Sequence, residues 1–133
     1  MNDEEFEHEK TRVQTARDKW HDLIVPPDYE VNWEYWREPI ENHPKAVMTC
    51  TPDWRYLQAH IDVCLPKVVD LGDAELEQIA LHEMCHILVN EMRPEPSPGE
   101  EYMDHEERVV STLVRRFHNI REEHDSELDQ NVE

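Results

Sequence analysis

Basic residues are scarce in this sequence: 13 lysines and arginines stand against 32 aspartates and glutamates, for a formal net charge of −19. Such an excess of negative charge repels phosphate backbones and anionic lipid surfaces, so nucleic-acid and membrane partners are disfavoured. The simplest interpretation of the charge is solubility, and a preference for basic substrates or partners is the alternative.

Long apolar runs are also missing. No stretch approaches the roughly 18 apolar residues of a membrane helix, and the first residues, MNDEEFEHEK, lack the basic and apolar regions of a signal peptide. The cysteines, Cys50, Cys64 and Cys85, show no C-x-x-C spacing, and their odd number argues against a disulfide framework. We therefore expect a cytoplasmic protein with reduced cysteines.

The length of 133 residues suits one compact domain. The end of the chain is acidic and nearly free of aromatic residues, a composition that buries too little apolar surface to fold. We predict a single domain over residues 1–121 and a disordered tail over residues 122–133.

Residue periodicity predicts one helix followed by three strands. Apolar residues at helical spacing predict an amphipathic helix over residues 3–23, which the following proline pair ends. Alternating polar and apolar residues predict a strand over residues 29–35. Residues 46–51 and 56–65 predict a hairpin, joined by a turn at a Pro-Asp pair.

Two more helices are expected after the hairpin. The first, from Asp73 as N-cap to about Glu91, is apolar on most sides and should be buried at the centre of the domain. A loop with three prolines separates it from a final amphipathic helix that begins near Asp104. The predicted fold class is α+β, with a small, mostly antiparallel sheet of about three strands crossed by the buried helix.

The buried helix contains the pattern H-E-x-x-H as His82-Glu83-Met84-Cys85-His86. Histidines four residues apart project from one helix face, so their ring nitrogens can converge on one ion at about 2.0 to 2.1 Å. Three ionisable side chains in an apolar helix are costly to bury unless they are paired or bound to a metal. The burial argument favours a metal site over histidines that are satisfied by hydrogen bonds alone.

Glu83 is rotated by about 100° from His82 around the helix, so it flanks the metal face and does not act as a ligand. Zinc lowers the pKa of a bound water towards about 7 and polarises a substrate carbonyl. A neighbouring carboxylate can take the proton of this water and pass it to a leaving amine. The residue types and their spacing therefore predict hydrolysis, with Zn²⁺ as cofactor and Glu83 as general base.

A catalytic zinc needs a third protein ligand from another element. The metzincin family is excluded because its additional glycine and histidine are absent after the motif. On the final helix, Glu107 precedes Val110 by three residues and Val114 by seven, so it shares their core-facing stripe. Glu106 is nearly as well placed, and His105 is a third candidate.

In these features the sequence resembles the gluzincins, and specifically the minimal, single-domain metallopeptidase-like proteins of phages and bacteria. The resemblance covers about residues 46–117, and the motif helix and residues 107–115 carry it. It implies a zinc peptidase acting on a peptide or protein, with Glu107 as the third ligand beside His82 and His86. It also implies that the strand ahead of the motif helix is a sheet edge that binds an extended peptide by strand addition. The residues of that strand are Gln58, Ala59, His60, Ile61 and Asp62.

The sequence departs from the larger gluzincins at two points. They often carry an aspartate four residues after the ligand glutamate to orient a zinc-bound histidine, whereas this chain has Ser111. They also supply a histidine or tyrosine that stabilises the oxyanion, for which Tyr102, His105 and His118 are the candidates here. Two alternatives therefore stay open: a zinc-stabilised interaction module with weak or no turnover, and an acidic interaction protein that needs no metal.

Overall fold

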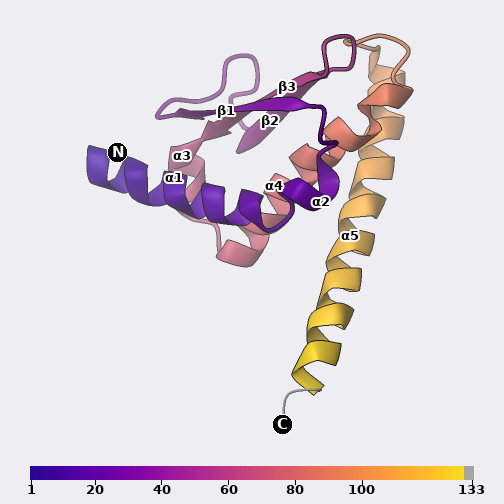
Figure 1. Cartoon of the computed structure of the whole chain (residues 1–133). Coiled ribbons are helices and arrows are strands. Elements are labelled where there is room, and N and C mark those ends of the chain that lie inside the picture. The colour runs from indigo at the N-terminus through magenta and orange to yellow at the C-terminus, as the bar shows by residue number, and fades with distance from the viewer. Residues whose placement is uncertain (131–133) are drawn as a thin grey trace.

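The computed structural model describes residues 1–130; the last three residues of the predicted tail, 131–133, lie outside the described part. It is an α+β fold, as predicted. Across the described residues, no helix combines the length and the apolar character that a membrane span requires. The elements in chain order (Figure 1) are α1 (Asp3–Asp18), α2 (His21–Ile24), β1 (Glu30–Trp36), β2 (Met48–Asp53), β3 (Gln58–Cys64), α3 (Leu65–Val68), α4 (Asp73–Val89), the 3-10 helix η1 (Asn90–Met92) and α5 (Glu100–Gln130).

The three strands form one sheet in the order β1-β3-β2. The central strand β3 is antiparallel to β2, with Met48 opposite Val63, and parallel to β1, with Glu30 opposite Gln58. The predicted hairpin is thus confirmed, but the sheet is mixed and not mostly antiparallel. Alternation identifies a strand without revealing its neighbour, and here β2 reverses the chain between β1 and β3, so that these two strands run the same way.

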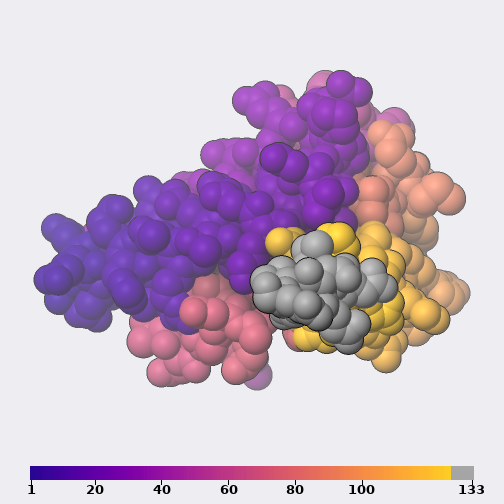
Figure 2. All heavy atoms as spheres, turned by 60° about the horizontal axis from the view of Figure 1, so that its bottom comes forward, coloured from indigo at the N-terminus to yellow at the C-terminus, as the bar shows by residue number. Residues whose placement is uncertain are grey.

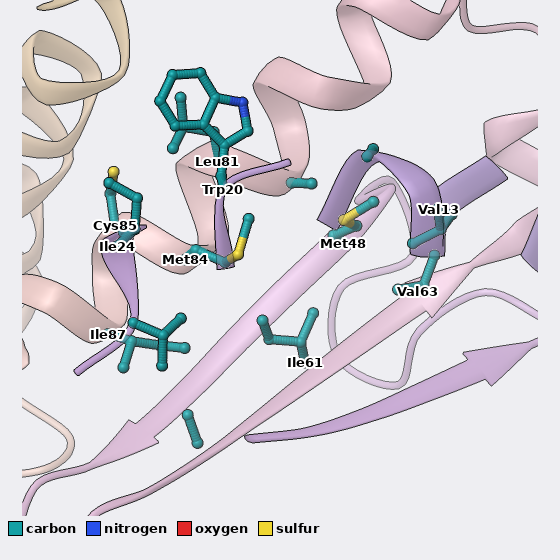
Figure 3. Close-up of a cluster of buried hydrophobic side chains, with 14 of the residues drawn as sticks. Val13, Trp20, Ile24, Met48, Ile61, Val63, Leu81, Met84, Cys85 and Ile87 are labelled. Carbon is teal, nitrogen blue, oxygen red and sulfur yellow. The ribbon is translucent and has the colours of Figure 1, made fainter. Parts of the chain in front are cut away.

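The hydrophobic core lies between one face of the sheet and the helices α1, α2 and α4 (Figures 1 and 3). Strand β3 turns Ala59, Ile61 and Val63 to this face, each 5% exposed or less. Helix α4 crosses the sheet and contributes Met84 and Ile87, both fully buried. Because successive strand residues point to opposite faces, the polar residues between these three positions point away from α4.

The N-terminal region forms two helices where the sequence predicts one. The chain breaks after α1 at Trp20, whose side chain is 3% exposed and whose Nε1 donates a 2.7 Å hydrogen bond to Glu77 of α4. The break also changes which residue is buried next: Ile24 is 5% exposed, whereas Leu23 is 74% exposed. Periodicity misses a break of this kind because the apolar spacing continues across it.

Helix α4 begins differently from the prediction. Its N-cap is Gly72, and no side chain caps the helix. Asp73 instead forms an ion pair of 2.9 Å with Arg12 of α1. The helix ends at Val89 and continues as the short η1, so the predicted extent of the helical region is nearly right. Asp73 is already the first residue of the helix, one position too late to be its N-cap.

Helix α5 is longer at both ends than the sequence predicts. It begins at Glu100, directly after Gly99, and it continues past the predicted domain boundary to Gln130. His118 and Glu122 form an i,i+4 pair of 3.1 Å across that boundary, and glutamate is a good helix former. The start of α1 and helix α5 lie on opposite sides of the molecule (Figure 2), whereas the end of α1 reaches α5, where Arg121 donates a hydrogen bond to the backbone oxygen of Lys19.

Candidate metal centre

The two motif histidines lie on one face of α4. Their ring centroids are 5.1 Å apart, and the ring planes are inclined at 71°. His86 is buried, while His82 is partly exposed at the edge of the core. One turn of helix separates the rings, and the turn is rigid because the apolar neighbours Met84 and Ile87 anchor it in the core.

Helix α5 brings Glu107 to both histidines. Its Oε2 lies 3.0 Å from Nε2 of His82, and its Oε1 lies 2.8 Å from Nε2 of His86. The three donor atoms lie within 4.8 Å of one another. Two imidazole nitrogens and one carboxylate oxygen are the donor set of a catalytic zinc site with one open position, so these residues fit the ion that the motif implies.

Glu106 has a different role from its neighbour. Its Oε2 accepts a 2.6 Å hydrogen bond from Nδ1 of His86, on the far side of the ring from Glu107. Arg93 donates to both carboxylate oxygens of Glu106, from Nε at 2.7 Å and from Nη2 at 2.5 Å. The geometry therefore separates the two candidates: Glu107 meets the face that would bind the ion, and Glu106 orients a histidine from behind.

The buried network sets which ring nitrogen of His86 carries a proton. Burial alone would raise the pKa of Glu106, but hydrogen bonds from Arg93 and His86 outweigh it and lower the pKa to about 2. Because the ionised carboxylate only accepts, His86 carries a proton on Nδ1, and its Nε2 can present a lone pair towards Glu107. The sequence analysis did not predict Arg93 as a site residue. The one hint in the sequence was that two glutamates, Glu106 and Glu107, stand side by side, so that the one not facing the histidines would need a partner of its own.

Glu83 is partly exposed beside the two histidines. Loss of solvent is the main cause that raises its pKa, to about 7; nearby His86 lowers it and Glu107 raises it. A carboxyl group with a pKa near neutrality can both accept and donate a proton. The residue that the sequence nominated as general base therefore has a suitable proton affinity.

An open pocket of about 550 Å³ lies next to His82 and Glu83. It is formed where α4, α5 and the chain leading into β2 meet, and its surface is mainly apolar. The residues that line it besides this histidine and glutamate are Ala46, Val47, Met48, Glu75, Gln78, Ile79, Ser111, Val114 and Arg115. The pocket is large enough for a side chain of a bound peptide.

The predicted strand-addition edge is wrong. Strand β3 is central, so its backbone hydrogen bonds are taken up by β1 on one side and β2 on the other. Its side chains do not approach the pocket: Ala59 and Ile61 are buried in the core, and the alternate residues point to the opposite face. The correction applies to all five predicted residues, Gln58, Ala59, His60, Ile61 and Asp62.

The sheet edge beside the pocket is β2. Cys64 donates a 2.9 Å backbone hydrogen bond to Val47, and hydrogen-bonded and non-hydrogen-bonded pairs alternate along an antiparallel ladder. The backbone groups of Met48, Cys50 and Pro52 therefore point away from β3. Pro52 has no N–H, and it occupies one of the positions whose backbone nitrogen does not bond to β3.

The three residues suggested for oxyanion stabilisation do not line the pocket. His105 pairs with Arg108 at 2.6 Å, and His118 pairs with Glu122 at 3.1 Å. Tyr102 lies near Arg93 and Glu106 and is partly exposed. Among the described residues that line the pocket, Arg115 is the only lysine or arginine, and the sequence analysis did not select it.

Comparisons with protein-family models, with curated proteins and with solved structures find no match for this chain. Membership of a zincin family therefore stays a prediction from the motif.

Proposed function

We propose that this protein is a zinc-dependent metallohydrolase that cleaves peptide bonds. The observation that carries the proposal is the convergence of Nε2 of His82 and Nε2 of His86 on one carboxylate, at 3.0 and 2.8 Å. That carboxylate, Glu107, comes from a separate helix, which leaves one side of the site open to the pocket. Such a three-ligand arrangement is typical of catalytic rather than structural zinc.

The chain's own residues divide the chemistry between them. A bound zinc ion would activate a water molecule for attack and polarise the scissile carbonyl. Glu83 takes the proton of the attacking water and delivers it to the amide nitrogen of the leaving group, for which a pKa of about 7 is suited. Glu106 keeps His86 in one tautomer and one orientation throughout.

An extended peptide along β2 would reach this centre. The outward backbone groups of Met48 and Cys50 can pair with a substrate strand, and Met48 also lines the pocket beside His82. A side chain of the substrate then enters the apolar part of the pocket. Arg115 offers a positive charge to a carbonyl or carboxylate group of the substrate at the pocket wall.

A zinc-stabilised module without turnover is the second candidate, because none of the three proposed oxyanion donors lines the pocket. Glu83→Gln distinguishes the two functions. It keeps the size of the side chain and removes the base, so it should reduce hydrolysis by about 10²- to 10⁴-fold and leave zinc content unchanged. A pure binder would show the same partner binding with either residue.

The test combines metal analysis with hydrolysis of a library of internally quenched peptides. Protein purified without added zinc should contain zinc, and His82→Ala should lose one equivalent together with all hydrolysis. His105→Ala is the matched control, since this histidine lies two residues before the proposed ligand but pairs with Arg108. A zinc content that His82→Ala does not change, or hydrolysis that Glu83→Gln does not reduce, would contradict the proposal.

A further inference from the structure

A second group of metal-ligating side chains lies on the sheet. Nε2 of His60 is 2.9 Å from Oδ1 of Asp62 and 3.2 Å from Oε2 of Glu34. One donor atom from each residue lies within 4.8 Å of the other two. His60 and Asp62 alternate with core residues of β3, so the group occupies the sheet face that points away from α1 and α4 (Figure 1).

The register of the sheet places two negative charges side by side. Glu34 of β1 stands directly opposite Asp62 of β3. Like charges directly opposite each other destabilise a pair of strands. Among the described residues, no lysine or arginine forms an ion pair with either carboxylate, and His60 is their common partner. A single imidazole carries at most one positive charge, so it does not balance two carboxylates.

Two further side chains hold the group in place. Nδ2 of Asn32 lies 3.1 Å from Nδ1 of His60, and Nε1 of Trp36 donates a 2.8 Å hydrogen bond to Oδ1 of Asp62. A turn of the Asn32 amide by half a rotation would let its oxygen accept Nδ1–H and leave Nε2 of His60 with a free lone pair. Such outer partners are what a ligating histidine and a ligating carboxylate require.

We propose that Glu34, His60 and Asp62 form a second metal site, separate from the centre on α4, that binds a divalent transition-metal ion such as Zn²⁺. One nitrogen and two oxygens suit ions of this class and give no preference for the soft ions that thiolates select. The ion would neutralise the facing carboxylates and cross-link the edge strand β1 to the central strand β3. The site does not depend on the proposed peptidase activity.

The test is a metal count on the full chain, equilibrated with Zn²⁺ and then freed of unbound ions. Wild type should hold two ions per chain. The double variant His82→Ala, His86→Ala should hold one, His60→Ala should hold one, and the combination of all three substitutions should hold none. If the α4 centre bound no metal, wild type would hold one ion, which only His60→Ala would remove; this result would overturn the proposed function and support the second site.

A matched pair of variants guards against loss of folding. Glu34→Gln and Glu30→Gln remove the same charge from the same strand and the same face, but only Glu34 belongs to the group. In the His82→Ala, His86→Ala background, Glu34→Gln should weaken Co²⁺ binding by at least about tenfold, since loss of an outer partner already weakens binding about 10- to 100-fold. Glu30→Gln should change it less than about twofold, because a distant charge is screened.

Trp36 provides a local readout, since its indole is bonded to Asp62. Co²⁺ should quench part of the tryptophan emission in the same background, and Trp36→Phe should remove that part. Equal quenching in Glu34→Gln and Glu30→Gln, or a wild-type count of one ion that His60→Ala leaves unchanged, would overturn the second site.

Discussion

The two groups of histidine and carboxylate side chains are built on different elements. The α4 centre takes two histidines from one helix turn and a glutamate from α5, whereas the sheet group takes its three side chains from the neighbouring strands β1 and β3. A helix fixes the distance between residues four apart by itself. Two strands bring residues together only when their register is set, and for Glu34 and Asp62 that register depends on the parallel pairing of β1.

The two groups also differ in how their charge is balanced. Behind the α4 centre, Arg93 neutralises Glu106, so the buried site carries a built-in counter-charge. On the sheet, His60 is the one basic side chain of the described residues that pairs with the two carboxylates. We infer that Arg93 and Glu106 hold His86 in place with or without an ion, and that the sheet group tightens when an ion binds.

The largest expected effect comes from Glu107→Ala, which removes a proposed ligand of the α4 centre. Loss of a residue that only hydrogen-bonds a ligand weakens metal binding about 10- to 100-fold. Loss of Glu107 itself should weaken zinc binding at the α4 centre by more than this, and hydrolysis should disappear. Competition with a fluorescent zinc chelator measures the first effect, and peptide cleavage the second. The sheet group should keep its ion. Full retention of zinc at the α4 centre would show that the third ligand is another residue.

Glu106→Gln should have the next largest effect, and on two properties. Zinc affinity should fall about 10- to 100-fold because His86 loses its orienting partner. Stability should fall by about 3 to 5 kcal/mol even without metal, since Arg93 is left as an uncompensated buried charge. Urea unfolding in the presence of EDTA measures the second effect.

The double variant Arg93→Met, Glu106→Gln is the control for this explanation. It leaves no buried charge unpaired, so it should recover much of the stability but not the zinc affinity. Equal stability of the single and double variants would refute the role given to Arg93.

The sequence predicted which side chains lie together at the α4 centre because the main signal for that grouping is local; whether they bind a metal stays a prediction. His82, Glu83 and His86 follow from helix geometry alone, and the apolar stripe of the last helix favoured Glu107 over Glu106. The stripe could not show that Arg93 folds back from η1 onto Glu106, because that contact joins two elements across a loop. Local spacing predicts which side chains share a helix face, but the partners behind them depend on tertiary packing.

The strand-addition edge failed for a related reason. Alternation correctly identified β3 as a strand with a buried face, but strand order is a property of the whole sheet. Because β1 pairs with the second side of β3, β3 is the central strand, and the edge strand beside the pocket is β2. His60 and Asp62 lie on the sheet face that points away from α4. In our proposal they belong to the second metal site and not to the α4 centre.

Arg115→Ala should have a moderate effect, limited to substrate binding. Arg115 lines the pocket beside His82 and is exposed, so its loss should leave zinc content and stability unchanged. If it contacts the substrate equally in the ground and transition states, KM should rise about tenfold while kcat stays the same. Steady-state kinetics separates the two constants. The neighbouring exposed Arg116, which does not line the pocket, gives the matched control as Arg116→Ala; an equal rise of KM in both variants would point to general charge and not to the pocket.

Glu77→Gln should have the smallest effect. It tests how much a carboxylate contributes to stability when side chains of the protein balance its charge. Burial would raise the pKa of Glu77, but hydrogen bonds from Lys19 and Trp20 outweigh it and hold the pKa below its ordinary value. A lowered pKa in the folded state adds stability above the unfolded-state pKa, and this stability is lost as the pH falls through the folded-state value.

Wild type should therefore be more stable than Glu77→Gln by about 1 to 2 kcal/mol at neutral pH, and the difference should vanish in strongly acidic solution. Urea unfolding over a pH series measures both. Zinc should not change the difference, because Lys19 and Trp20 already satisfy this carboxylate. A change of this stability difference with zinc would show that zinc also acts on a carboxylate whose charge the protein already balances. The lack of such balance would then no longer be a reason to expect an ion between Glu34 and Asp62.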